Sequence, residues 1–102
     1  MDEKFKVRRH EVFNAWLKEQ KNAHDKTLYV AVIKLVRKIR RGNPGCRKSV
    51  GGRVSELKID YGPGYRIYYT KRGLNIIFLL CAGDKSEQKK DIKLARKLAQ
   101  EV

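Results

Sequence analysis

A short corner of glycine and proline, Gly62-Pro63-Gly64, separates two segments in which polar and apolar residues alternate. Alternation with a period of two is typical of β-strands, because successive side chains point to opposite faces of a strand. Glycine tolerates backbone angles that strain other residues, and proline restricts its own backbone, so the corner favours a tight turn. Residues 53–70 therefore predict an antiparallel hairpin.

The alternation also predicts which side chains share a face of this hairpin. The apolar face carries Leu57, Ile59, Tyr65, Ile67 and Tyr69. The opposite face carries Glu56, Lys58, Asp60, Arg66, Tyr68 and Thr70. Because this second set is polar, we expect it to be exposed to solvent, with Lys58 close to Arg66 and Tyr68.

The middle of the chain predicts a helix with two different faces. Its apolar stripe is formed by Leu28, Val32, Leu35 and Ile39. Its basic ridge is formed by Lys34, Arg37, Lys38 and Arg41, which also recur at helical spacing. Asp25 is a candidate cap for this helix, and the GNPG segment at 42–45 ends it. Such a ridge is often only a solvated surface, but the high charge of the chain favours contact with phosphate.

Three further elements complete the expected order. The chain starts with a short extended stretch, followed by a helix whose apolar residues are Val12, Phe13, Leu17 and the core anchor Trp16. The segment NIIFLLCAG at 75–83 is apolar on both faces and predicts a central strand. A last helix, capped by Asp84 or Ser86, turns inward Ile92, Ala95, Leu98 and Val102. The order β-α-α-β-β-β-α predicts one α+β domain over residues 1–102.

The charge of the chain limits its partners. Lysine and arginine number 25 against 11 aspartates and glutamates, which gives a net charge of +14 and an isoelectric point of about 10.1. Such an excess is typical of proteins that bind a polyanion or an acidic protein, and nucleic acid is the first expectation. A membrane surface is disfavoured, because the basic segments carry no wide apolar face.

The expected location is the cytoplasm. The longest apolar run, residues 76–82, is much shorter than the roughly 20 residues needed to span a bilayer, and the amino terminus has no apolar signal segment. Cys46 and Cys81 match neither a disulfide framework nor a metal motif, so we interpret Cys81 as a core residue and expect no metal or cofactor. His10 and His24 belong to no motif, and we expect them at the surface or its boundary.

The candidate site is the polar face of the hairpin together with Lys85, which follows the central strand. Tyr68 beside Lys58 and Arg66 suits RNA, since tyrosine stacks on exposed bases and arginine pairs with phosphate. Attack of a 2′-hydroxyl on its phosphodiester needs a proton acceptor, cations around phosphorus and a proton donor, so the set also suits metal-independent cleavage. A lysine crowded by cations loses its proton more readily, which makes Lys58 a candidate base. The alternative is that the four residues only bind RNA.

Several segments, taken in order, resemble a known family. They are WL in the first helix, IRRGNPG, KSVGGRVSELKIDYGPGYRIYY, GLNIIFLLCAGDKSEQKKDI and LARKLA. Together they resemble the phage-derived Gp49-like, HigB-type branch of the RelE/ParE toxin superfamily, over nearly the whole chain. The Glu-Leu-x-Ile, Tyr-Gly-Pro-Gly-Tyr-Arg and Gly-Asp-Lys blocks are specific in combination.

The resemblance implies a compact antiparallel sheet packed by helices, and the toxin of a type II toxin–antitoxin pair. Relatives of the RelE kind enter the ribosomal A site and cut mRNA without a metal, using basic residues on the sheet. By position, the resemblance implies that Arg66 contacts the scissile phosphate, that Lys58 acts as base or charge stabiliser, and that Lys85 supports the leaving group. Tyr68 is a candidate stacking or acid group, and Asp91 stands where some relatives have a tyrosine. The further cations expected to bind RNA are Lys34, Arg37, Lys38, Arg41 and Arg53.

The implied partners are the ribosome with its mRNA and a small helix-turn-helix antitoxin of the HigA kind, in a hetero-oligomer. An acidic or amphipathic antitoxin segment would cover the basic surface. Two other functions stay open, a ParE-like toxin that poisons DNA gyrase and a non-catalytic RNA-binding protein. The basic side chains on the strand face favour the ribonuclease over the gyrase toxin, and the incomplete catalytic set keeps the non-catalytic RNA-binding protein open.

Overall fold

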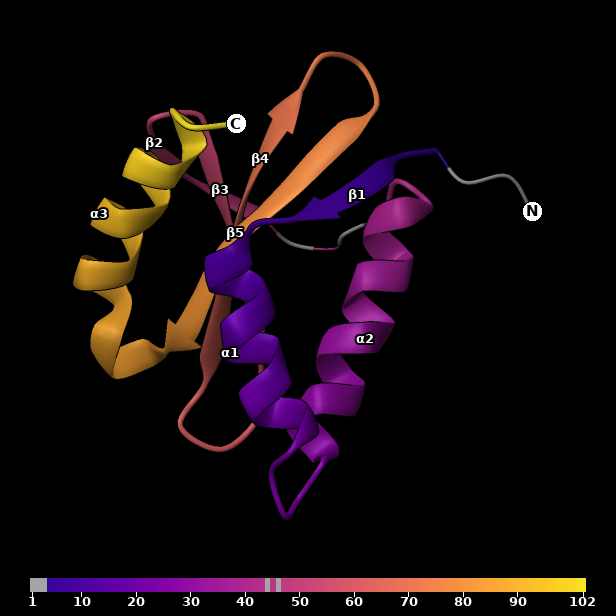
Figure 1. The fold of residues 1–102 in the computed structure, drawn as a ribbon, viewed down its shortest axis with the longest axis vertical. Coiled ribbons are helices and arrows are strands. Elements are labelled where there is room, and N and C mark those ends of the chain that lie inside the picture. The colour runs from indigo at the N-terminus through magenta and orange to yellow at the C-terminus, as the bar shows by residue number, and fades with distance from the viewer. Residues whose placement is uncertain (1–3, 44, 46) are drawn as a thin grey trace.

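The computed structural model describes residues 4–43, 45 and 47–102, and it has the α+β architecture expected from the sequence. In chain order the elements are β1 (Lys6–Arg9), α1 (Glu11–Lys21), α2 (Thr27–Arg40), β2 (Arg47–Gly51), β3 (Val54–Ile59), β4 (Tyr65–Arg72), β5 (Ile76–Asp84), the short 3-10 helix η1 (Lys85–Glu87) and α3 (Gln88–Ala99). The strands form a five-stranded sheet with the order β1-β5-β4-β3-β2 (Figure 1).

The predicted antiparallel hairpin and its glycine corner are confirmed. β3 and β4 are antiparallel, and Lys58 pairs directly with Arg66. Gly62 and Gly64 have φ angles of 56° and 89°, a left-handed region that glycine enters without strain. The strand predicted at 75–83 is β5, which lies between β1 and β4.

Two features of the sheet differ from the expected order. β2 is an additional edge strand, antiparallel to β3, with an irregular register between Ser49 and Gly51. Its sequence, RKSVG, is exposed along most of its length, so no apolar alternation marks it as a strand. β1 is parallel to β5, which makes the sheet mixed rather than wholly antiparallel. Two helices and three strands separate β1 from β5 in the chain, so no short turn forces them to run antiparallel.

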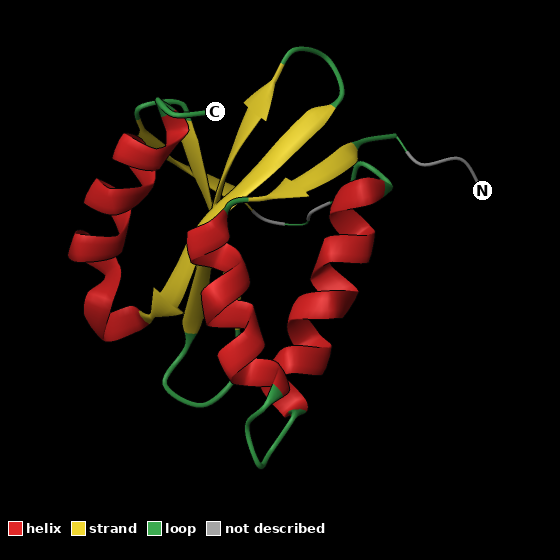
Figure 2. Ribbon diagram, in the orientation of Figure 1, coloured by secondary structure: helices red, strands yellow, loops and turns green. Residues whose placement is uncertain are grey.

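Helices cover the sheet on both faces (Figure 2). α1 and α2 pack on one face, where the buried core consists of Phe13, Leu17, Leu28, Val32, Val36, Ile39, Leu57, Ile59, Ile67, Tyr69, Ile77 and Leu79. α3 packs on the other face, where the buried core consists of Val54, Tyr68, Leu80, Cys81, Ala95, Leu98 and Ala99. Successive side chains of the inner strands therefore alternate between two cores.

The polar face of the hairpin is buried, so the prediction that it is exposed to solvent is wrong. The exposed fractions are 3% for Glu56, 8% for Arg66, 0% for Tyr68 and 2% for Thr70. The physical reason is that α3 packs against β3, β4 and β5 on this face and replaces the water around these side chains. Lys58, one residue before the end of β3, stays exposed.

Local capping explains where two of the helices begin. α2 begins at Thr27, whose N–H and hydroxyl donate to the Asp25 carboxylate at 2.9 and 2.6 Å. Asp25 therefore satisfies a backbone donor at the start of the helix, but the N-cap position is occupied by Lys26 and not by the expected Asp25. After β5, the Asp84 carboxylate accepts the N–H of Ser86 at 2.9 Å and starts η1. α2 ends before the GNPG segment, of which Pro44 lies outside the described residues.

The predicted apolar stripes are confirmed with two differences. α3 ends at Ala99, so Val102, expected on its inward face, lies beyond the helix. In α2, Val36 is buried and Leu35 is only half-buried, because Val36 lies on the side of the helix that faces the sheet. Trp16 is half-buried against the core beneath α1 and α2, in agreement with its interpretation as a core anchor. Cys81 is buried as expected, and Cys46 lies outside the described residues. Among the described helices, none is long and apolar enough to cross a membrane.

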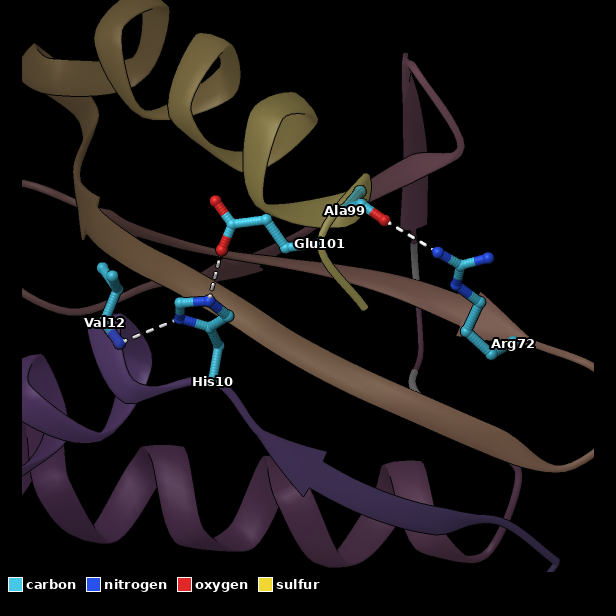
Figure 3. A network of polar contacts seen from close by, with 5 residues as sticks. All are labelled: His10, Val12, Arg72, Ala99 and Glu101. Carbon is cyan, nitrogen blue, oxygen red and sulfur yellow. Dashed lines mark hydrogen bonds and ion pairs between the residues drawn. The ribbon is translucent and has the colours of Figure 1, made fainter.

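His10 caps α1 and connects it to the last residues of the chain (Figure 3). Its Nδ1 accepts the N–H of Val12 at 3.1 Å, and its Nε2 lies 3.2 Å from Oε1 of Glu101. An Nδ1 that accepts leaves the proton on Nε2, which therefore donates to the carboxylate. Close by, the Arg72 guanidinium donates to the Ala99 carbonyl at 3.0 Å, at the end of α3. His10 is half-buried and serves the fold.

Candidate active site

Three of the four residues expected to act on RNA line the same hollow. Lys58, Arg66 and Lys85 surround an open space of about 360 Å³, together with Asp60 and the corner residues 61–64. Lys58 and Lys85 are exposed, whereas Arg66 reaches the hollow from a buried stem. We call this hollow the hairpin depression.

Backbone pairing sets the spacing of these cations. Lys58 on β3 lies directly opposite Arg66 on β4, and Arg66 lies opposite Gly83 on β5. Directly paired residues place their Cβ atoms about 5 Å apart on one face of the sheet. The N–H of Lys85, which follows β5, donates to the Gly64 carbonyl at 2.9 Å. The glycine corner therefore contacts the end of β5 and brings the third cation to the hairpin depression.

Arg66 is held in place by a buried carboxylate. Its Nε lies 3.3 Å from Oε1 of Glu56, and the two side chains are 9% and 3% exposed. The other carboxylate oxygen, Oε2, accepts a hydrogen bond from Nε2 of Gln88 in α3 at 2.8 Å. Glu56 therefore contacts side chains from β4 and α3 at once. Nη1 of Arg66 lies 3.5 Å from the Tyr65 carbonyl oxygen, so the end of the guanidinium borders the hairpin depression.

The hairpin depression carries more positive than negative charge. Lys58, Arg66 and Lys85 are cationic, and Asp60 is the carboxylate among its lining residues. A phosphate group placed there would meet two ammonium groups and a guanidinium fork, which pairs with two phosphate oxygens at once. The arrangement therefore suits the binding of a phosphodiester.

Tyr68, the fourth expected residue, does not reach the hairpin depression. Its side chain is completely buried between the sheet and α3. Burial raises the pKa of its hydroxyl far above the usual range, and the nearby Glu56 carboxylate adds to the increase. The prediction that Tyr68 lies exposed beside Lys58 is wrong, because α3 covers it, and its ring is not accessible to a nucleobase in this arrangement.

Tyr61 supplies an aromatic ring that the sequence pattern did not single out. It lines the hairpin depression, and its ring stacks on Tyr65 with the centroids 6.4 Å apart. Tyr65 in turn packs against Trp16. The Tyr61 hydroxyl donates to Asp25 at 2.8 Å, and this hydrogen bond raises the pKa of Tyr61. A ring supported in this way at the edge of a cationic hollow suits base stacking. The sequence signal is its position next to the glycine corner, beyond the alternating residues.

The other cations expected to bind RNA lie elsewhere on the surface. The exposed residues of the basic ridge on α2 and its end are Lys34, Arg37, Lys38 and Arg41. Arg53 is exposed in the turn between β2 and β3, with a φ angle of 62°. None of these five residues lines the hairpin depression. The structure thus brings Lys58, Arg66 and Lys85 together and leaves the remaining cations as separate surface groups.

Asp91, which stands where some relatives have a tyrosine, faces the sheet from α3. The Asp91 carboxylate packs closely on Gly83 of β5. A Cβ atom added to Gly83 would collide with this carboxylate. Burial raises the pKa of the Asp91 carboxyl. The Cys81 thiol donates to the backbone carbonyl of Asp91, with the two atoms 3.6 Å apart. Asp91 therefore helps to seat α3 on the sheet and does not line the hairpin depression.

Known proteins resemble this chain across the whole of this site. The family described as "Phage derived protein Gp49-like" matches residues 15–100, a range that includes every residue of the hairpin depression. A protein of Haemophilus influenzae with the name "Uncharacterized protein" is 46% identical over 90 residues, which cover 88% of each chain. No solved structure matches the chain significantly. The chain belongs to the Gp49-like family of phage-derived proteins, within the RelE/ParE-like toxin superfamily.

Proposed function

We propose that this protein is the toxin of a type II toxin–antitoxin pair and that it cleaves mRNA on the ribosome. The Gp49-like family suggests a toxin. The observation that carries the proposal further is the convergence of Lys58, Arg66 and Lys85 around the hairpin depression. Three cations around one hollow suit a phosphodiester, because negative charge builds up on its oxygens during cleavage and fixed cations stabilise that charge.

In the proposed reaction a ribose 2′-hydroxyl attacks the adjacent phosphorus, and the 5′-oxygen of the next nucleotide leaves. Arg66 binds the scissile phosphate through its two terminal nitrogens, because its Nε faces the Glu56 carboxylate. Lys58, in its neutral form, accepts the proton of the 2′-hydroxyl, and Lys85 donates a proton to the departing oxygen. The products are a 2′,3′-cyclic phosphate and a 5′-hydroxyl.

Asp60 is a second candidate for the proton acceptor. Its carboxylate lines the hairpin depression and is exposed. A carboxylate accepts a proton without first losing one, whereas a lysine must be neutral to do so. Asp60→Asn, which removes the carboxylate and keeps the size of the side chain, decides between the two groups: unchanged cleavage by this variant excludes Asp60 as the proton acceptor.

The proposed partners are the ribosome with its mRNA and a helix-turn-helix antitoxin of the HigA kind. A net charge of +14 favours approach to RNA, because each phosphate contact releases counterions. The basic ridge of α2 and Arg53 would add contacts that do not depend on RNA sequence. An acidic antitoxin segment would neutralise the same surface.

Inducible expression in bacteria tests the proposal. Growth and genome-wide RNA 5′ ends are compared for the wild type, Lys58→Ala and Lys85→Ala, with Lys89→Ala on α3 as control for the loss of one exposed charge. Replacing an exposed lysine leaves no buried charge unpaired, so these variants should stay folded. We expect new 5′ ends within translated frames for the wild type and the control. Loss of one stabilising group lowers such cleavage by about 100- to 1000-fold.

Two other outcomes would contradict the proposal. Growth arrest with a DNA-damage response and intact mRNA would indicate gyrase poisoning. RNA binding in the absence of any cleavage would indicate a non-catalytic RNA-binding protein.

A further inference from the structure

A second cationic hollow is lined by residues of α1, α2 and β1. The two helices converge toward their connecting loop (Figure 1). The volume of the hollow is about 400 Å³, and the buried side chain of Leu17 forms part of its wall. The polar residues that line it, from β1, α1 and α2, are Arg9, Asn14, Lys18, Lys21, Asn22 and Tyr29. We call this hollow the interhelical pocket.

The charged groups of the interhelical pocket are all positive. Arg9, Lys18 and Lys21 are exposed, and no carboxylate stands among the described residues that line the pocket. Within the described part of the chain, none of the three forms a salt bridge. Like charges gathered in a concave site repel one another, and an anionic ligand relieves this repulsion.

The uncharged side chains favour a nucleotide over an acidic peptide. Asn14 and Asn22 offer amide donors and acceptors, which match the edges of nucleobases. The half-buried Tyr29 offers a ring on which a base can stack. A carboxylate-bearing peptide could use the cations and the amides, but an acidic segment brings no flat ring to stack on Tyr29. The volume of about 400 Å³ falls within the roughly 300–1,000 Å³ of small-ligand sites.

We propose that the interhelical pocket binds one nucleotide of single-stranded RNA outside the hairpin depression. Arg9, Lys18 and Lys21 hold its phosphate, and Tyr29 stacks on its base. The inference deepens the proposed function, since it rests on RNA being the ligand. It adds a site that positions the strand and takes no part in the cleavage chemistry.

The loop between α1 and α2 connects the two sites. Asn22 of the interhelical pocket lies three residues before Asp25 in the sequence, and three residues span at most about 11 Å. Asp25 in turn accepts a hydrogen bond of 2.8 Å from Tyr61 of the hairpin depression. One short RNA strand can therefore reach both sites.

RNA binding by two charge-matched triple variants tests the proposal. The pocket variant carries Arg9→Gln, Lys18→Gln and Lys21→Gln. The control variant changes three exposed residues of α3, Lys89→Gln, Lys93→Gln and Lys97→Gln. Each variant loses three of the 14 net positive charges. Both are made in a Lys85→Ala background, so that the RNA stays intact. Fluorescence anisotropy then measures their affinity for a short fluorescein-labelled single-stranded RNA at several salt concentrations.

We expect the pocket variant to bind RNA about tenfold more weakly than the control variant. The slope of log affinity against log salt should also fall by about 0.7, because the pocket holds one phosphate and each lost phosphate contact on a single strand removes about 0.7. In the same background, Tyr29→Phe should bind like the parent, and Tyr29→Leu about tenfold more weakly, because only the former keeps the ring.

Equal affinities and equal salt slopes for the two triple variants would overturn the proposal, since RNA would then respond to total charge alone. The outcome is independent of cleavage. A pocket variant that loses RNA binding in a protein that makes no RNA 5′ ends would support the interhelical pocket and reject the nuclease. If the wild type cleaves RNA and both triple variants bind RNA equally, the nuclease is supported and the interhelical pocket is rejected.

Discussion

Replacing Arg66 by alanine is predicted to destabilise the fold as well as to remove a phosphate contact. The change leaves the Glu56 carboxylate, 3% exposed, without the guanidinium that lies 3.3 Å away. Removing one partner of a buried ion pair costs about 3–5 kcal/mol of unfolding free energy, because the remaining charge is uncompensated. Gln88 still donates to Glu56, so we expect the lower end of this range. Domains are stable by about 5–15 kcal/mol, and the variant should therefore fold with a much smaller margin.

A double-mutant cycle isolates the source of this cost. Glu56→Gln keeps the size of the side chain and a polar partner for Gln88, but it removes the negative charge. We expect Arg66→Ala combined with Glu56→Gln to be more stable than Arg66→Ala alone by about 2 kcal/mol, because neither charge is then buried unpaired. Urea denaturation followed by the fluorescence of Trp16, the single tryptophan, gives the four free energies of the cycle.

A double variant no more stable than Arg66→Ala would refute the reasoning, because the Glu56 carboxylate could not then be the cause of the loss. Both variants should lack RNA cleavage under conditions where they are folded, since both lack the guanidinium. Cleavage that returned in the double variant would show that Arg66 acts only through stability.

Three further changes test the packing around the site. Gly83→Ala should lower stability by about 1–3 kcal/mol in urea denaturation, because the new Cβ collides with the Asp91 carboxylate; the same loss in an Asp91→Ala background would contradict this cause. Asp91→Asn should raise the urea midpoint at neutral pH. Burial raises the pKa of the Asp91 carboxyl above 3.8, so the folded state favours the protonated form and wild-type stability falls as pH rises through the folded pKa. The advantage of the variant should therefore disappear below pH 3.8, and an advantage that persisted in acid would point to packing instead. Asp25→Ala removes the acceptor of Thr27 and Tyr61 and should lower the urea midpoint, whereas Tyr61→Phe, which removes one of these bonds, should lower it less.

The hairpin is predictable from the sequence because its causes are local. Side-chain alternation and turn chemistry depend on neighbouring residues, so the register of Lys58 against Arg66 follows from them. Which face a helix covers is not a local property. From the sequence, Glu56 and Arg66 are expected to face solvent, but in the structure they pair with each other. Gln88, 32 residues further along the chain, donates the hydrogen bond that completes the burial of Glu56. A polar face closed by distant residues leaves no periodic signal.

The residues of the candidate site also differ in how far the sequence predicts them. Lys85 joins the hairpin depression because its N–H donates to the Gly64 carbonyl, a contact between a turn and a strand end. The sequence pattern indicated Lys85 by its position after the central strand, and the family resemblance added its role at the leaving group. The alternation of polar and apolar residues could not identify Tyr61 as a site residue, because Tyr61 lies in the turn after β3 has ended. The same alternation could not predict β2, because an exposed edge strand needs no apolar face.

Arg66 and the two lysines have different physical parts in the hairpin depression. Glu56, with Oε1 3.3 Å from Nε, offsets much of the charge of the guanidinium, so Arg66 contributes a fixed direction more than net attraction. Lys58 and Lys85 are exposed, and neither forms a salt bridge within the described residues, so they supply the positive charge that draws a phosphate in. The phosphate then meets a guanidinium whose position is already set by β3 and α3. Because that ordering occurs during folding, it need not be repeated when RNA binds, and this is the condition under which fixed charges stabilise a transition state most effectively.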